Sequence, residues 1–309
     1  MEKKILMAVD DSIHSNQSIR YAIHILSGAK DVTFTLFHGQ PMISQYLLDE
    51  AKTDPKLSAS LKKAIKKNTA KAKTLLEKQK KRMITMGVPS EHIEMVAQPT
   101  MIGRSKDILE YARKGIYDAI VVGRRGLSRI QKTFMGSTSA ELLESADVIP
   151  VWMVDGNVTS QRILVAVDGS ESSYRALDHV ESMFSENPEI KLSLFHVSPE
   201  AEDIDAFSFE KDDPDIQDIV TKGSERLMGK FFADAALKLK EAGIAADRVE
   251  IITIKRKAKV GKMILAEAKK GNYGTVVVGR RGADQSHFFG SVSRYVTERI
   301  TNRALWLVS

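Results

Sequence analysis

The sequence of 309 residues repeats itself once, and this duplication restricts the folds open to the chain more than any other feature. The segment Ile5–Ser12 (ILMAVDDS) corresponds to Ile163–Ser170 (ILVAVDGS), and the loop Gly123–Gly126 (GRRG) returns as Gly279–Gly282 (GRRG). Landmarks that keep their order over about 150 residues indicate the duplication of a whole domain, because solenoid repeats are much shorter. We therefore expect two tandem domains of the same fold.

Strand-like runs alternate with helical patterns in each half. Such alternation predicts an α/β fold with two tandem, doubly wound, parallel five-stranded sheets of the Rossmann-like kind, because parallel neighbours need crossover connections. The predicted domains are residues 1–155 and 156–309. The predicted strands of the first half are Lys4–Asp10, Val32–His38, His92–Val96, Tyr117–Gly123 and Val148–Val154. Its predicted helices are Ser15–Leu26, Leu57–Met86, Lys106–Lys114 and Thr138–Ser145, the last with a capping box at Thr138–Glu141.

Composition restricts the class of protein. Hydrophobic residues make up 43% of the chain and charged residues 28%, which is typical of globular proteins. No apolar run approaches the roughly 20 residues of a membrane helix. The opening segment leads directly into a predicted strand, so we expect no signal peptide and a cytoplasmic protein. The absence of cysteine excludes disulfides, thiolate zinc sites and thiol catalysis.

The positive charge is concentrated in one predicted helix. Residues 1–155 hold 24 Lys and Arg against 17 Asp and Glu, whereas residues 156–309 hold 22 against 23. Ten basic residues and one acid, Glu77, lie in Leu61–Arg82, whose apolar residues recur at helical spacing. The simpler interpretation is a solvated helix face, and the alternative is a surface for an anionic partner such as nucleic acid.

Two predicted strand ends carry the residues of a candidate ligand site. The first strand ends in Val9-Asp10, and the fourth ends in Val122-Gly123. In open parallel sheets, ligands bind at the carboxyl ends of strands where the strand order reverses. A carboxylate there can accept hydrogen bonds from ribose hydroxyls or an adenine amine, while glycines and a helix N-terminus suit phosphate. Taken singly, Asp10 could be a helix cap and Gly123 a turn; together they indicate a nucleotide site.

The spacing Gly123-x-x-Gly126, then nine residues, then Gly136-Ser137 resembles the ATP-binding signature of the universal stress protein family. The Val-Asp-x-Ser start of each half also resembles that family, and the resemblance covers the whole chain as two tandem domains. It implies an adenine-nucleotide alpha hydrolase-like fold and a stress-response regulatory protein. The resemblance also implies ATP as ligand, with Mg²⁺ held mainly by the phosphates, and allows slow ATP hydrolysis.

The resemblance also implies which residues would surround the nucleotide. In the first half they are Val9, Asp10, Gly39, Val122, Gly123, Arg125, Gly126, Gly136, Ser137, Thr138 and Ser139. In the second half they are Asp168, Val197, Gly279, Arg281, Gly282, Gly290, Ser291, Val292 and Ser293. The second loop has seven residues between its last two glycines instead of nine, so we favour the first site and keep the second as conditional. Domains of the family usually pair through the last strand, so the resemblance implies that the two halves of this chain form an internal pseudo-dimer. Trp152 and Trp306 would pack at the seam, where the two last strands meet. The resemblance also allows a further homodimer of the whole chain.

No residue is indicated as catalytic. The sequence lacks a Walker A loop and a G-x-G-x-x-G motif, and its histidines show no metal-ligand spacing. His38 and His196 end equivalent strands, and we expect them to be strand-edge residues rather than general bases. Two alternatives stay open beside nucleotide binding: a nucleotide hydrolase, and a nucleic-acid or protein interaction module that uses residues 61–82 beside a vestigial nucleotide site. Any regulatory protein partner is unidentified.

Overall fold

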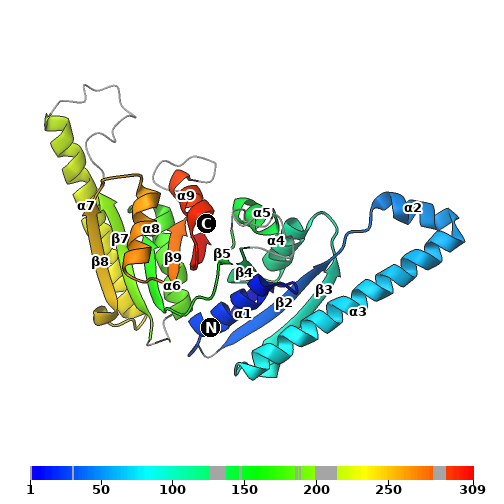
Figure 1. Ribbon diagram of the computed structural model, residues 1–309. Coiled ribbons are helices and arrows are strands. Elements are labelled where there is room, and N and C mark those ends of the chain that lie inside the picture. The colour runs from blue at the N-terminus through cyan, green and yellow to red at the C-terminus, as the bar shows by residue number, and fades with distance from the viewer. Residues whose placement is uncertain are drawn as a thin grey trace. The chain divides into compact units, whose positions relative to one another are not determined.

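The computed structural model describes residues 2–29, 31–124, 137–145, 148–184, 187, 189–198, 214–280 and 290–309, with the backbone alone for 214–221. The chain divides into two compact units (Figure 1). Unit 1 consists of residues 1–25 and 30–157, and unit 2 consists of residues 26–29 and 158–309.

Unit 1 contains a sheet of five parallel strands in the order β3-β2-β1-β4-β5. Its strands are β1 (Lys3–Ala8), β2 (Val32–Gln40), β3 (Ile93–Pro99), β4 (Ala119–Gly123) and β5 (Val151–Val154). Its helices are α1 (Ile13–Ile25), α2 (Gln45–Thr53), α3 (Pro55–Thr85), α4 (Arg104–Lys114) and α5 (Ser137–Ser145), with a 3-10 turn at Ser90–His92. Because every pair of neighbouring strands is parallel, each connection crosses over through a helix.

Unit 2 repeats this arrangement in the strand order β8-β7-β6-β9-β10. Its strands are β6 (Arg162–Ala166), β7 (Lys191–Ser198), β8 (Val249–Lys255), β9 (Thr275–Gly279) and β10 (Ala304–Val308). Its helices are α6 (Glu171–Phe184), α7 (Pro214–Glu241), α8 (Val260–Lys270) and α9 (Ser291–Arg299), with a 3-10 turn at Ala246–Arg248. The predicted fold class, two doubly wound parallel sheets, is confirmed.

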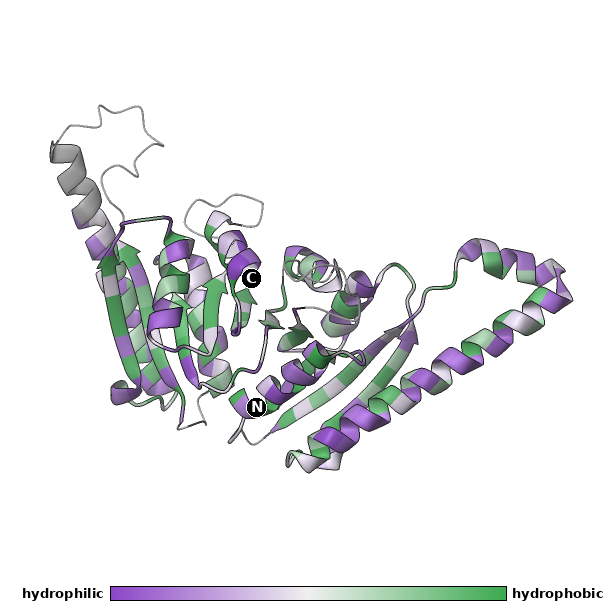
Figure 2. Ribbon diagram, in the orientation of Figure 1, coloured by the Kyte–Doolittle hydropathy of each residue, from purple (hydrophilic) through white to green (hydrophobic). Residues whose placement is uncertain are grey.

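Large apolar side chains fill the interior of each unit. The central strands are strongly hydrophobic, while the outer faces of the helices are polar (Figure 2). Trp152 is fully buried and meets the ring of Tyr21 edge-on at 6.4 Å. Trp306 is equally buried and stacks on Phe184 at 5.1 Å. Each tryptophan therefore contacts an aromatic ring of its own unit. The pairing of the last strands, with these side chains at the seam, stays a prediction.

A hydrogen bond from a buried tyrosine hydroxyl to a second hydroxyl group recurs in both cores. The Tyr117 hydroxyl donates to Thr35 Oγ1 at 2.8 Å, and Thr35 donates to Glu94 at 2.9 Å. In unit 2 the Tyr273 hydroxyl donates to Ser193 Oγ at 2.8 Å. Burial raises the pKa of Tyr117 to about 12, so its hydroxyl keeps its proton and remains a donor.

The lysine-rich helix is α3, and its two halves have different surroundings. Figure 1 shows that the first half projects beyond the strands of unit 1, with α2 beside it. In the second half Ala72, Leu76 and Met83 are buried, whereas Leu61 and Ile65 in the first half are only partly covered. The lysines between them are mostly exposed, which agrees with a solvated face. Helix α2 was not predicted.

Several predicted boundaries were wrong by a few residues. The strand expected from His92 begins at Ile93, because Ser90–His92 form a 3-10 turn. The strand expected from Val148 begins at Val151, directly after Pro150, which has no N–H to donate. Thr138 lies inside α5 instead of capping it. No helix in the described part of the chain combines the length and apolar character needed to span a bilayer.

Candidate functional site

The candidate site of unit 1 lies where β1 and β4 end side by side. These strands are parallel neighbours, but β1 leads through α1 to β2 on one side, while β4 leads through α5 to β5 on the other. The strand order therefore reverses between them, which is where open α/β sheets bind ligands. In unit 2, β6 and β9 have the same relationship.

Asp10 organises the loop between β1 and α1. Its Oδ1 accepts the N–H of Ser12 at 3.0 Å, and its own N–H donates to Ser15 Oγ at 3.1 Å. Asp168 forms the same turn in unit 2, accepting the N–H of Ser170 at 3.0 Å. Asp10 does not cap α1 (Ile13–Ile25), because the first-turn N–H of Ser15 donates to Ser12 Oγ at 3.1 Å. The Asp10 turn comes just before the helix and fixes a partly exposed carboxylate at the rim of the sheet.

Gly123 allows the end of β4 to approach the start of α1. A Cβ at this position would lie 2.8 Å from the carbonyl carbon and oxygen of His14, so any side chain would force the two segments apart. The Gly123 carbonyl accepts the hydroxyl of Ser139, in the first turn of α5, at 2.7 Å. In unit 2, Ser293 of α9 donates to the Arg280 carbonyl at 2.9 Å. A helix N-terminus, with its unpaired N–H groups, therefore lies at the switch point of each unit.

His38 and His196 connect neighbouring strand ends, as expected. Nδ1 of His38 is 2.8 Å from the carbonyl oxygen of Val9, and Nδ1 of His196 is 2.9 Å from that of Val167. Because a carbonyl oxygen only accepts, each ring carries its proton on Nδ1. Next to His38, a Cβ on Gly39 would lie 3.3 Å from Thr100 Oγ1, so the space there is tight.

Some of the predicted ligand residues lie in the described part of the chain, and others lie outside it. Val9 and Val122 are buried at the ends of β1 and β4. Ser137 and Thr138 lie in the first turn of α5, while Gly290, Ser291 and Val292 lie at the start of α9. Gly279 ends β9, and Val197 lies near the end of β7. Outside the described residues lie Arg125, Gly126, Gly136, Arg281 and Gly282.

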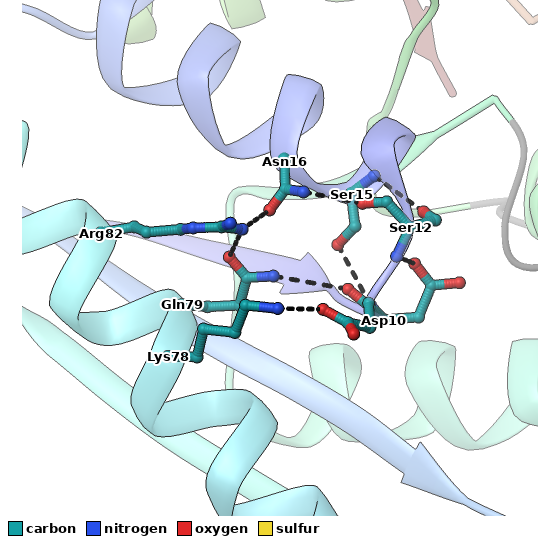
Figure 3. A network of polar contacts seen from close by, with 8 residues as sticks. Asp10, Ser12, Ser15, Asn16, Lys78, Gln79 and Arg82 are labelled. Atoms are coloured by element: carbon teal, nitrogen blue, oxygen red, sulfur yellow. Dashed lines mark hydrogen bonds and ion pairs between the residues drawn. The ribbon is translucent and has the colours of Figure 1, made fainter.

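A polar network, in which α3 holds the Asp10 loop, was not predicted from the sequence (Figure 3). Lys78 pairs with Asp11 at 2.7 Å, and Gln79 Nε2 donates to the Asp10 carbonyl at 3.5 Å. Gln79 is fully buried although it interrupts the apolar stripe of α3. A polar residue in a buried stripe needs a partner, and this was the signal that could have revealed the network.

The network continues from the loop to the outer side of α1. Asn16 Nδ2 donates to the Ser12 carbonyl at 3.0 Å, and Asn16 Oδ1 accepts from Arg82 on α3. Arg82 also donates to Gln79 Oε1 at 3.4 Å. Among the described residues, no group of three or more His, Asp or Glu side chains could hold a metal ion.

The model of the universal stress protein family matches this chain twice, at residues 1–155 and 159–303. The chain belongs to the universal stress protein family. Among solved structures, this universal stress protein is similar to one from Archaeoglobus fulgidus DSM 4304, with a TM-score of 0.63 and 19% identity over 99% of this chain and 98% of that chain. It is also similar to a functionally unknown protein from Pseudomonas aeruginosa PAO1, with a TM-score of 0.61 and 13% identity over 99% and 92%. At these identities the likeness shows the fold alone. No curated protein sequence matches the chain.

Proposed function

We propose that this universal stress protein binds an adenine nucleotide, ATP, at the switch point of unit 1 and acts as a stress-response regulatory module. The observation that carries the proposal is the convergence of three features at one point. They are the Asp10 turn, the close approach of Gly123 to α1, and the N-terminus of α5, which Ser139 ties to β4. A carboxylate, a backbone without side chain and a helix N-terminus are the groups that fit a nucleoside phosphate.

Each part of the nucleotide has a suitable partner. The Asp10 carboxylate would accept hydrogen bonds from the ribose or from the adenine amine, and the N–H groups at the start of α5 would face the phosphates. Mg²⁺ would be held mainly by those phosphates. Arg125, Gly126 and Gly136 would complete the phosphate loop. With no base assigned, ATP hydrolysis would be slow at most.

Unit 2 is a conditional second site. It repeats the aspartate turn at Asp168 and the tied helix start at Ser293. Its glycine loop is two residues shorter and Val197 replaces Gly39, so we propose weaker or no binding there.

A matched pair of variants tests the proposal. Asp10→Asn keeps an oxygen that can accept the Ser12 N–H, so the turn survives while the charge is lost; Asp168→Asn is the same change in unit 2. Calorimetric titration with Mg-ATP should show that Asp10→Asn weakens the tighter site about ten-fold or more, the usual effect of losing a charged hydrogen bond. Asp168→Asn should leave that site unchanged. Equal ATP affinity in the wild type and Asp10→Asn would refute the assignment.

A second candidate, an interaction module, rests on α3. Its projecting half exposes lysines and leaves Leu61 and Ile65 only partly covered. An anionic partner such as nucleic acid would bind there with strong salt dependence. Unchanged electrophoretic mobility of generic DNA at low salt would exclude this candidate.

A further inference from the structure

Unit 2 provides an internal reference for unit 1, and the first helix of each unit fixes the alignment. Ser15 and Ser173 occupy equivalent places, because each accepts the N–H of the aspartate that follows the first strand, at 3.1 and 2.9 Å. Five residues further along each helix, Arg20 on α1 therefore corresponds to Asp178 on α6.

The long helices align at their C-terminal ends. Gly87 and Gly243 follow α3 and α7 with positive φ angles of 93° and 78°, and each is followed by a 3-10 turn. Five residues before these glycines, Arg82 on α3 corresponds to Lys238 on α7. The two aligned positions thus hold two arginines in unit 1 but a lysine and an aspartate in unit 2.

In unit 2, side chains of the unit itself occupy the space between the two helices. Lys238 forms an ion pair with Asp178. The Tyr174 hydroxyl donates to Asp234 at 2.9 Å, and the Tyr174 ring meets Phe231 at 4.8 Å. The pairing of Lys238 with Asp178 shows that the two aligned positions are close enough for direct contact.

In unit 1, the same place is a cleft of about 420 Å³, which we call the α1–α3 cleft. It is lined by Ile13, Asn16, Gln17, Ile19, Arg20, Gln79, Arg82, Thr85, Met86 and Asn157. The lining contains two guanidinium groups, four carboxamides and a hydroxyl, and it includes no carboxylate. Its volume falls within the range of small-molecule sites.

The charges of the cleft are not balanced by its lining. Arg82 donates to the uncharged side chains of Asn16 and Gln79. Arg20 makes no hydrogen bond or ion pair within the described part of the chain. Gln17 Oε1 is buried there and, among the same residues, has no hydrogen-bond partner. A carboxylate stands between the helices of unit 2, and unit 1 lacks its counterpart.

We propose that the α1–α3 cleft binds a small hydroxylated organic anion whose carboxylate or phosphate group lies between Arg20 and Arg82, where Asp178 supplies the carboxylate in unit 2. Guanidinium groups bind both kinds of anion through paired N–H donors. Gln17, Thr85 and Asn157 present amide and hydroxyl groups to the hydroxylated remainder of the ligand.

This site differs from the nucleotide site and does not depend on it. The nucleotide site lies at the strand ends, while the cleft lies between α1 and α3. Asn16 and Gln79 connect the two sites, since they line the cleft and donate hydrogen bonds to backbone carbonyls of the Asp10 loop. An anion that draws Arg82 away from Asn16 would therefore also act on the loop that carries Asp10.

Calorimetric titration of the full chain without nucleotide tests the proposal. The probes are glycerol phosphate and glycerate, which separate phosphate from carboxylate, with glycerol as the neutral control. Arg20→Asp places at position 20 the acid that unit 2 has. Lys106→Asp makes the same charge change at an exposed position of α4, outside the cleft and away from the lysines of α3.

Saturable binding of at least one anion to the wild type is expected, without binding of glycerol. Arg20→Asp should weaken that binding about ten-fold or more, and Lys106→Asp should change it less than about two-fold. Because Arg20 is exposed, the variant Arg20→Asp should still fold. Its melting temperature verifies this. Failure of both anions to bind the wild type up to about 10 mM, or equal affinity in the wild type and Arg20→Asp, would overturn the proposal.

Discussion

Lys238 on α7 forms an ion pair with Asp178 on α6, whereas the two equivalent positions of unit 1 hold arginines. The duplicated scaffold has therefore kept its strand order and its aspartate turn, while the charge has reversed at one of the two aligned positions, Arg20 against Asp178. In unit 2 the chain supplies the anion itself; in unit 1 the anion has to come from elsewhere.

This difference predicts opposite stability effects for two charge reversals. Arg20→Asp should raise the free energy of unfolding of unit 1 by about 0.5 kcal/mol, and Asp178→Arg should lower that of unit 2 by a similar amount. The values are small because Lys238 and Asp178 are 41% and 49% exposed. Hydrogen exchange at low salt, analysed separately for each unit, measures both changes in the free energy of unfolding. The two changes should become smaller in about 1 M NaCl, which screens the charges. Changes of the same sign would contradict the alignment.

The buried tyrosine hydrogen bonds of the two units should contribute equally to the free energy of unfolding. Tyr117→Phe and Tyr273→Phe each remove a buried hydrogen bond to a hydroxyl and should each cost about 1 kcal/mol. Urea denaturation measures this cost. Tyr46→Phe, on exposed α2, is the control and should leave stability unchanged.

His179 should make unit 2 sensitive to acid. Burial lowers the pKa of His179 from 6.5 to about 3, so the folded state holds the neutral ring. The unfolded chain takes up a proton below pH 6.5, and stability is therefore lost as the pH falls from 6.5 towards 3. At about 1.4 kcal/mol per pH unit, this amounts to about 2 kcal/mol at pH 5.

The variant His179→Leu isolates this contribution. Its free energy of unfolding should depend less steeply on pH between 6.5 and 4 than that of the wild type, because the other titrating groups are unchanged. Parallel pH profiles of the two proteins would show that His179 does not carry the effect.

Two glycine-to-alanine changes should act in opposite directions. Gly123→Ala places a Cβ 2.8 Å from the backbone of His14 and should destabilise unit 1 by about 1–3 kcal/mol. Gly229 lies inside α7 with nothing within 4 Å of the place that a Cβ would take, so Gly229→Ala should stabilise unit 2 by about 0.5–1 kcal/mol. Thermal unfolding distinguishes them, and a tolerated Gly123→Ala would show that the approach of β4 to α1 is not tight.

The parallel sheets could be predicted from the sequence because each strand is a short apolar run and each crossover helix has its own periodicity. Helix α2 could not, since Tyr46, Leu47 and Leu48 are consecutive rather than spaced, and none of its residues is buried. Its start depends instead on the Ser44 side chain, which accepts the N–H of Leu47.

The candidate nucleotide site was predictable at its anchor points, because Asp10 and Gly123 end strands whose order follows from the fold. The cleft between α1 and α3 was not, because it depends on which faces of two helices meet. One signal was nevertheless present in the repeat: aligned at Ser15 and Ser173, it sets Arg20 against Asp178, a reversal of charge.

The number of ATP molecules bound per chain tests the central claim most directly. Equilibrium dialysis of the purified protein against Mg-ATP should give one nucleotide per chain at unit 1, rising towards two only if the shorter loop of unit 2 also binds. No bound nucleotide at millimolar Mg-ATP would contradict the account.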